Sequence, residues 1–100
     1  MKFTITKSNF LDGLNHVSRV IAPNSLFEIL KGIKIELEKD KLILKASDSL
    51  VSVEYSINSY EDDKEIITIE EEGQVVLPSR NFIEIIRKAP TDLIEIETIE

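Results

Sequence analysis

The chain has 100 residues, no cysteine and a formal net charge of -7, so it is expected to form one domain without disulfide or thiolate chemistry. Hydrophobic residues make up 42% and charged residues 31%, a balance typical of a folded globular domain and unlike a disordered chain. No apolar run is long enough to span a membrane, and the first residues, MKFTITKSNF, lack the apolar middle of a signal peptide, so we expect a cytoplasmic protein with no membrane contact.

The N-terminal third predicts a strand, a helix and a loop. Residues 2–6, KFTIT, alternate as a half-buried strand does, and Ser8 is a candidate cap for a helix over residues 7–21. The apolar side of this helix comprises Phe10, Leu14, Val17 and Ile21, and the opposite side comprises Asp12, Asn15, His16 and Arg19. Pro23 is expected to end the helix, and residues 22–31 to form a loop.

An antiparallel sheet with one buried face is expected next. Apolar and polar side chains alternate with a period of two in residues 32–38, 41–47 and 50–57. Within the second of these segments, Ile43 is expected on the outer face between two lysines. A turn at Lys39-Asp40 joins the first two strands as a hairpin, and two shorter strands, residues 65–70 and 74–77, meet at Gly73.

A second helix and a final strand complete the pattern. Pro78 ends the preceding strand and Ser79 is a candidate cap for a helix over residues 79–89. Its inner face is expected to hold Phe82, Ile85, Ile86 and Ala89. Arg80 and Arg87 are seven residues apart, so they share an outer stripe with Glu84 between them. Pro90 closes this helix, and LIEIET, residues 93–98, reads as the last strand.

Charge is unevenly distributed between the predicted helices and strands. Residues 7–21 and 79–90 hold five basic residues against two acidic ones, a net charge of +3, so the remainder carries -10. Seven acids lie in residues 61–72, EDDKEIITIEEE, against the single Lys64. The basic residues on these helices either stabilise the helix ends, as is common, or form a binding surface for a polyanion such as DNA.

The residues give no support for catalysis, a metal or a cofactor. The single histidine, His16, reads as a solvated residue on a helix surface. The chain has no Gly-rich phosphate loop and no His-Glu metal spacing. The acidic run of residues 61–72 lacks the alternating ligands and central glycine of a calcium loop, so we interpret it as a solvated edge. Asp48 is better explained as a turn residue than as an acid paired with Glu54.

Three blocks of the sequence resemble the bacterial DNA polymerase III beta subunit family, the sliding clamps. The start, MKFTITKSNFLDGLNHV, is similar to the start of that family. The block ILKGIKIELEKDKLILKASDSLVSVEYSI carries Ser47-Asp48 where the family has Thr or Ser followed by Asp. The block VVLPSRNFIEIIRKAP resembles the family pattern of Val-Pro-small-Arg, an aromatic residue, a helix and Leu-Pro. The three blocks occur in order over nearly all 100 residues.

The resemblance implies an α+β DNA clamp fold, with antiparallel sheets outside, two helices on one inner face, and a βαβββ repeat whose second copy stops early. In this family three such domains per subunit form a head-to-tail dimeric ring around duplex DNA, which makes the polymerase processive without catalysing a reaction. Residues 1–100 are then the N-terminal domain without its last strands, and we expect them to be a piece of a longer chain. Polymerase and clamp loader would bind through domains outside these residues, in the cytoplasm at the nucleoid.

The resemblance also suggests individual site residues. The DNA-facing candidates, which would contact phosphates without reading sequence, are Arg80, Arg87, Lys88, Arg19, Asn15, Lys7 and Asn24. Asn81 and Ile85 correspond to helix positions that face the other subunit in the family.

One departure from the family leaves a second interpretation open. Asn24 and Glu28 stand where the family usually has an Arg and then a Pro, which predicts a lost phosphate contact and an added carboxylate. With the acidic net charge, this favours a divergent clamp or a clamp-derived protein-interaction module that no longer encircles DNA. Arg80, Arg87 and Lys88 favour the ring.

Overall fold

The computed structural model describes residues 1–19, 32–47 and 51–99, and the side chains of Ser79 and Arg80 lie outside this description. Along the chain it contains β1 (Lys2–Thr6), α1 (Lys7–Ser18), β2 (Gly32–Leu37), β3 (Lys41–Ser47), β4 (Ser52–Asn58), β5 (Tyr60–Glu61), β6 (Lys64–Glu65), β7 (Ile67–Glu71), β8 (Gly73–Pro78), α2 (Ser79–Lys88) and β9 (Leu93–Glu97). The predicted α+β class is confirmed. No helix in the described part of the chain is long and apolar enough to cross a bilayer.

Within the described ranges, the strands pair antiparallel in three sheets. A four-stranded sheet has the order β4-β3-β2-β8, and a three-stranded sheet has the order β7-β1-β9. The predicted hairpin at Lys39-Asp40 is confirmed, because Leu37 pairs with Leu42 and the Glu38 N–H donates to the Lys41 carbonyl at 2.9 Å. The strands β7 and β8 follow one another in sequence, yet they pair with β1 and β2 respectively and so belong to different sheets.

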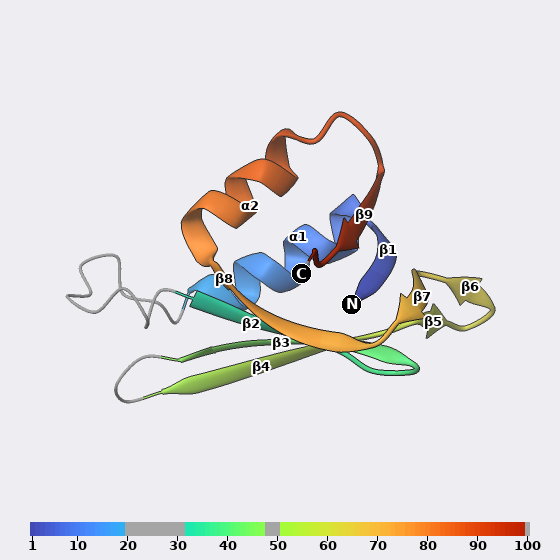
Figure 1. Ribbon diagram of the computed structural model, residues 1–100, viewed down its shortest axis with the longest axis horizontal. Helices are drawn as coiled ribbons and strands as arrows, with labels where there is room; N and C mark the ends of the chain where they lie inside the picture. Colours follow the sequence, from blue (N-terminus) through green and yellow to red (C-terminus); the bar gives the residue numbers. More distant parts are fainter. Residues whose placement is uncertain (20–31, 48–50, 100) are drawn as a thin grey trace.

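The two helices lie side by side on one side of the long four-stranded sheet, as the amphipathic patterns predict (Figure 1). The contact between them includes Phe10 of α1, whose ring packs edge-on against Phe82 of α2 at 5.7 Å and against Phe3 of β1 at 6.0 Å. On its other side α1 meets the sheet, and Gly13 allows close approach, since a Cβ there would lie 2.8 Å from Leu44 Cδ1. The helix α1 is therefore packed between α2 and the sheet.

Both predicted serine caps are wrong. The N-cap of α1 is Thr6 and that of α2 is Pro78, and neither makes a side-chain cap hydrogen bond. At the start of α1 the Lys7 N–H instead donates to the carbonyl of Asp92 at 2.7 Å, so a neighbouring loop accepts one of the free helix donors. The helix α1 ends at Ser18 with Arg19 as C-cap, and the expectations for Ile21, Pro23 and residues 22–31 lie outside the described residues.

The inner face predicted for α2 is wrong at one position. Ile83 and Ile86 are buried and Phe82 and Ala89 are partly buried, whereas Ile85 is 68% exposed. Ten residues make fewer than three turns, and the packed side of α2 is centred on Ile83 and Ile86, so Ile85 falls on the outer side.

The predicted strand over residues 65–70 is interrupted at Ile66, which separates β6 from β7. The short strands β5 and β6 form a hairpin that the sequence analysis did not predict. It is anchored at Ser59, whose carbonyl accepts from the N–H groups of Ile66 and Ile67. At its turn Asp62 has a φ of 56°, a left-handed conformation that Asp tolerates better than most residues.

Ile43 lies on the outer face of β3, as alternation predicts, but it is only 5% exposed. Its cross-strand partners are Glu36 and Ser56. Lys34 and Lys45 both reach Glu36 on this face, with Nζ–Oε1 distances of 3.1 and 3.3 Å. Long charged side chains cover apolar surface with their aliphatic stems while the charges stay in water, which explains a buried isoleucine outside the core.

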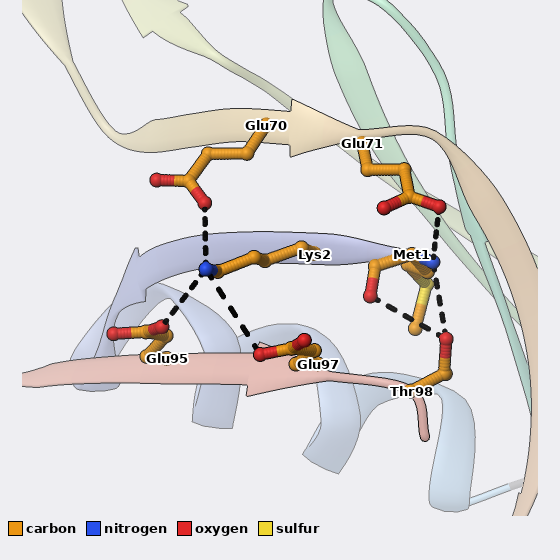
Figure 2. A network of polar contacts seen from close by, with 7 residues as sticks. All are labelled: Met1, Lys2, Glu70, Glu71, Glu95, Glu97 and Thr98. Carbon is orange, nitrogen blue, oxygen red and sulfur yellow. Dashed lines mark hydrogen bonds and ion pairs between the residues drawn. The ribbon is translucent and has the colours of Figure 1, made fainter. Parts of the chain in front are cut away.

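The first two residues connect all three strands of the smaller sheet (Figure 2). Lys2 Nζ lies 3.3 Å from a carboxylate oxygen of Glu70 and 3.9 Å from those of Glu95 and Glu97. The hydrogen bond to Glu70, aided by all three carboxylates, raises the pKa of Lys2. The amino group of Met1 donates to Thr98 Oγ1 at 3.0 Å. The acidic residues on this outer face are therefore held by one lysine at the centre of the sheet.

Candidate nucleic-acid interface

The helix α2 carries three of the seven predicted DNA-facing residues, Arg80, Arg87 and Lys88. Its apolar positions Ile83 and Ile86 turn inward, which leaves the stripe of Arg80, Glu84 and Arg87 on another side of the helix. The exposure predicted for Arg87 is confirmed, with 54% of its side chain accessible, while the side chain of Arg80 lies outside the described part. The stripe thus contains an acid between two bases.

Arg87 already has a partner within its own helix. Its Nη1 donates to Oε1 of Glu84 one turn earlier, and 44% of the Glu84 side chain is exposed. This ion pair neutralises part of the positive charge that the sequence places on α2. Among the described side chains of this stripe, the positive charge of Arg87 is therefore offset by the carboxylate of Glu84.

Lys88 differs from Arg87 because its ammonium group is exposed and has neither a hydrogen bond nor an ion pair within the described residues. It lies in the last turn of α2, where the helix dipole favours positive charge. It is therefore the described cation of this helix that is most accessible to an anion.

Lys7 has a structural contact at the junction of the two helices. Its Nζ donates to the carbonyl oxygen of Ala89 at 2.8 Å, so the first residue of α1 satisfies a carbonyl at the C-terminal end of α2. Sequence reasoning placed Lys7 beside α1 as a weak DNA contact and missed this role. The order of helices and strands in the sequence could not predict this hydrogen bond, because it joins residues 82 positions apart.

The other DNA-facing candidates at α1 do not form a cluster of exposed charge. Asn15 is half-buried, and Arg19 is exposed at the C-cap. His16 is exposed, as expected, but its ring stacks on Tyr55 at 5.0 Å, and its Nδ1–H donates to the Asp12 carbonyl at 2.6 Å. Asn24 and Glu28 lie outside the described residues.

The proposed interface positions Asn81 and Ile85 are both exposed and lie one turn apart on α2. Ile85 borders an open, largely apolar groove between α2 and β9, whose other lining residues include Phe82, Ile86, Leu93, Ile94 and Ile96. Leu93 is also exposed, at 59%. The exposed isoleucine and leucine therefore belong to one continuous apolar surface.

The acidic hairpin β5–β6 lies at the end of the molecule away from α2 (Figure 1). Glu65 accepts hydrogen bonds from Thr68 Oγ1 at 2.6 Å and from the Tyr60 hydroxyl at 2.8 Å, and these bonds lower the pKa of Glu65. The hydrogen bond to Glu65 raises the pKa of Tyr60. Within the described ranges, no three His, Cys, Asp or Glu side chains are grouped so that they could hold a metal ion.

Comparison with known proteins identifies related sequences over the whole chain. The family model described as "DNA polymerase III beta subunit, N-terminal domain" matches residues 1–100. The chain is 41% identical over 100 residues to the beta sliding clamp of Staphylococcus epidermidis and 40% identical to that of Staphylococcus aureus, and it spans 26% of the length of each. It therefore covers about a quarter of the curated relatives that it matches.

Solved structures show the same similarity in three dimensions. The crystal structure of a DNA polymerase sliding clamp from Bacillus subtilis superposes with a TM-score of 0.92 at 41% identity, covering 97% of this chain and 26% of that one. The beta subunit of a DNA polymerase from Streptococcus pyogenes superposes with a TM-score of 0.89 at 29% identity, covering all of this chain and 25% of that one.

Proposed function

Because the chain belongs to the DNA polymerase III beta subunit family, whose N-terminal domain it matches over residues 1–100, we propose that it forms the first domain of a sliding clamp. The complete ring encircles duplex DNA and keeps the replicative polymerase on its template, and it acts by enclosure and not by catalysis. The observation that carries this proposal is the family match over the whole chain together with the superposition on a solved sliding clamp.

The arrangement of charge supports a helical surface that faces DNA. The helices α1 and α2 lie together on one side of the long sheet (Figure 1). Exposed basic residues are Arg87 and Lys88 on α2 and Arg19 at the C-cap of α1. The three carboxylates around Lys2 lie on the strands of the smaller sheet (Figure 2). A positive inner surface attracts phosphates, and negative strands discourage DNA from binding to the outside.

We assign Arg80, Arg87, Lys88 and Arg19 to phosphate contacts, with Lys7 and Asn15 at the margin of the surface and Asn24 in the segment outside the description. Contacts to phosphates alone carry no sequence information, so such a surface holds DNA without choosing a site. This property suits a ring that slides.

The partners follow from the same assignment. Asn81 and Ile85 are proposed to face a second copy of the protein, because they are exposed on α2 next to an apolar groove. Polymerase and clamp loader would bind through parts of the protein outside residues 1–100. The complex would work at the nucleoid in the cytoplasm.

The decisive experiment asks whether the protein is linked to DNA topologically. The complete gene product containing residues 1–100 is loaded onto nicked circular DNA with its clamp loader and then separated from free protein by gel filtration. We expect retention on the circle and loss after the circle is cut once with a restriction enzyme, because a ring slides off an end. Equal retention on circular and linear DNA, or binding to neither, would instead support the clamp-derived interaction module.

A single substitution on α2 tests whether this helix faces DNA. We expect Arg80→Ala to reduce retention on circular DNA and to lower the salt dependence of DNA binding by roughly one counterion, without changing the melting temperature. An unchanged slope of binding affinity against salt concentration would show that Arg80 contributes only a helix charge.

A further inference from the structure

The ion pair between Glu84 and Arg87 places a carboxylate on a guanidinium that the proposed function assigns to DNA phosphate. Both side chains are about half exposed, so the pair lies at the surface and is open to competition from solvent ions. A carboxylate and a phosphate bind a guanidinium through the same N–H donors, and one guanidinium nitrogen, Nη1, is already engaged by Glu84. A phosphate that takes this N–H has to displace Glu84, and one that binds the remaining N–H donors of Arg87 has to approach the negative charge of Glu84.

We propose that Glu84 is an internal competitor that keeps the contact between Arg87 and DNA weak. The inference rests on the proposed function, since it assumes that α2 faces DNA. A sliding ring gains from phosphate contacts that exchange rapidly, because a tightly held phosphate would resist movement along the duplex. Glu84 holds Arg87 near the DNA side of α2 and also lowers the affinity of each individual contact.

The expected size of the effect follows from the strength of exposed ion pairs. Such pairs contribute up to about 1 kcal/mol, which corresponds to a change in affinity of up to about fivefold. Removing the carboxylate in Glu84→Gln should therefore tighten DNA binding about two- to fivefold. It should also steepen the slope of log affinity against log salt by about 0.9, the value for one additional phosphate contact on duplex DNA.

The experiment is a double-mutant cycle on the complete gene product with a fluorescently labelled 30-base-pair duplex, titrated by anisotropy at several salt concentrations. The four proteins are the parent, Glu84→Gln, Arg87→Gln and the double variant. We expect the gain from Glu84→Gln to shrink markedly when Arg87 is replaced, because Glu84 then has no guanidinium to occupy. This coupling separates competition for Arg87 from general repulsion between Glu84 and DNA.

Asp63→Asn provides a matched control for net charge. Asp63 is an exposed acid on the turn between β5 and β6, at the end of the molecule away from α2 (Figure 1), so its replacement changes net charge equally without touching Arg87. We expect it to tighten binding less than Glu84→Gln does and to leave the slope against salt unchanged.

Two results would overturn the proposal. An equal gain from Glu84→Gln with and without Arg87 would mean that Glu84 acts only through bulk charge. A lower melting temperature for Glu84→Gln with unchanged DNA affinity would mean that the pair only stabilises the helix. Neither result affects the comparison of circular with linear DNA, so failure of the competitor role is distinguishable from failure of the clamp function.

Discussion

The two helices carry similar amphipathic patterns but differ in their surroundings. The helix α1 buries Phe10, Gly13, Leu14 and Val17 and is packed between the four-stranded sheet and α2. Among the described side chains of α2, only Ile83 and Ile86 are buried, and Ile85 is open to solvent. The comparison indicates that α1 is mainly a scaffold, whereas α2 presents a surface.

The basic residues differ in the same way. Lys7 at the start of α1 donates a hydrogen bond to the carbonyl of Ala89, the C-cap residue of α2, and so helps to position that helix. Arg87 and Lys88 at the end of α2 point to solvent, and Arg87 is held only by a neighbour on the same helix. A substitution on the buried side of α1 should therefore act on stability, and one on the outer side of α2 should act on binding.

The largest expected effect is the loss of the aromatic contact between the helices. Phe10 is fully buried and packs edge-on against both Phe3 and Phe82. We expect Phe10→Ala to lower the free energy of unfolding by about 3–5 kcal/mol, measured by urea denaturation, because it leaves a cavity at the centre of the core. The control Ile85→Ala on α2 should change it by less than about 0.5 kcal/mol. Similar losses for both variants would remove the distinction between scaffold and surface helix.

A smaller loss is expected where α1 approaches the sheet most closely. A Cβ at Gly13 would lie 2.8 Å from Leu44 Cδ1 and 3.0 Å from Tyr55 Cδ1, so Gly13→Val overfills the space between helix and sheet. We expect a loss of about 1–3 kcal/mol in the free energy of unfolding, again by urea denaturation. Asp12→Val, at the adjacent exposed position of the same helix, controls for the poor helix propensity of valine. If the two variants were equally stable, the close packing of Gly13 against the sheet would not contribute to the free energy of unfolding.

Much of the fold was predictable because burial and alternation are local properties. Strands β2, β3 and β9 follow the alternation of apolar and polar residues, and the turn at Lys39-Asp40 lies where the pattern reverses. The assignment of β7 and β8 to different sheets was not predictable, because it depends on pairing with β1 and β2 and not on the short segment between them. The capping error at α1 has the same cause, since the Asp92 carbonyl that accepts from the first turn of α1 is distant in sequence.

The charged stripe of the candidate site was predictable from the sequence, but the exposure of its apolar neighbour was not. The spacing of Arg80 and Arg87 places them on one side of a helix whatever the fold. The ion pair of Arg87 with Glu84 could have been inferred from their three-residue separation. The exposure of Ile85 could not, because amphipathic spacing fixes the apolar side of a short helix only to within about one residue, and the packing around Ile83 decides the rest.

Ile85 offers a test of α2 as a binding surface. If Ile85 faces a second copy, Ile85→Glu introduces a charge into an apolar interface and should weaken the dimer about tenfold or more, measured by analytical ultracentrifugation of the complete gene product. The melting temperature should stay close to that of the parent at concentrations where both proteins are monomeric, because the side chain is 68% exposed. Unchanged association would place the interface elsewhere. Ile85→Leu keeps the apolar surface and should keep the dimer.

The smallest expected effect concerns the outer face of the long sheet, where Glu36 pairs with Lys34 of its own strand β2 and with Lys45 of the neighbouring strand β3. Glu36 accepts hydrogen bonds from Lys34 and Lys45, which lower the pKa of Glu36 below its ordinary value of 4.5. The bond from Lys34 has the larger effect on this pKa. The unfolded chain then binds this proton more readily than the folded one, so the contribution is fully present above pH 4.5 and disappears as pH falls through the folded pKa. We therefore expect Glu36→Gln to flatten the fall in stability below pH 4.5, measured by thermal denaturation across a pH series. Lys34→Gln should flatten it more than Lys45→Gln, because Lys34 makes the shorter contact, at 3.1 Å against 3.3 Å. If stability fell with decreasing pH in the same way in all three variants and the parent, the ion pairs of Glu36 would not contribute to folding.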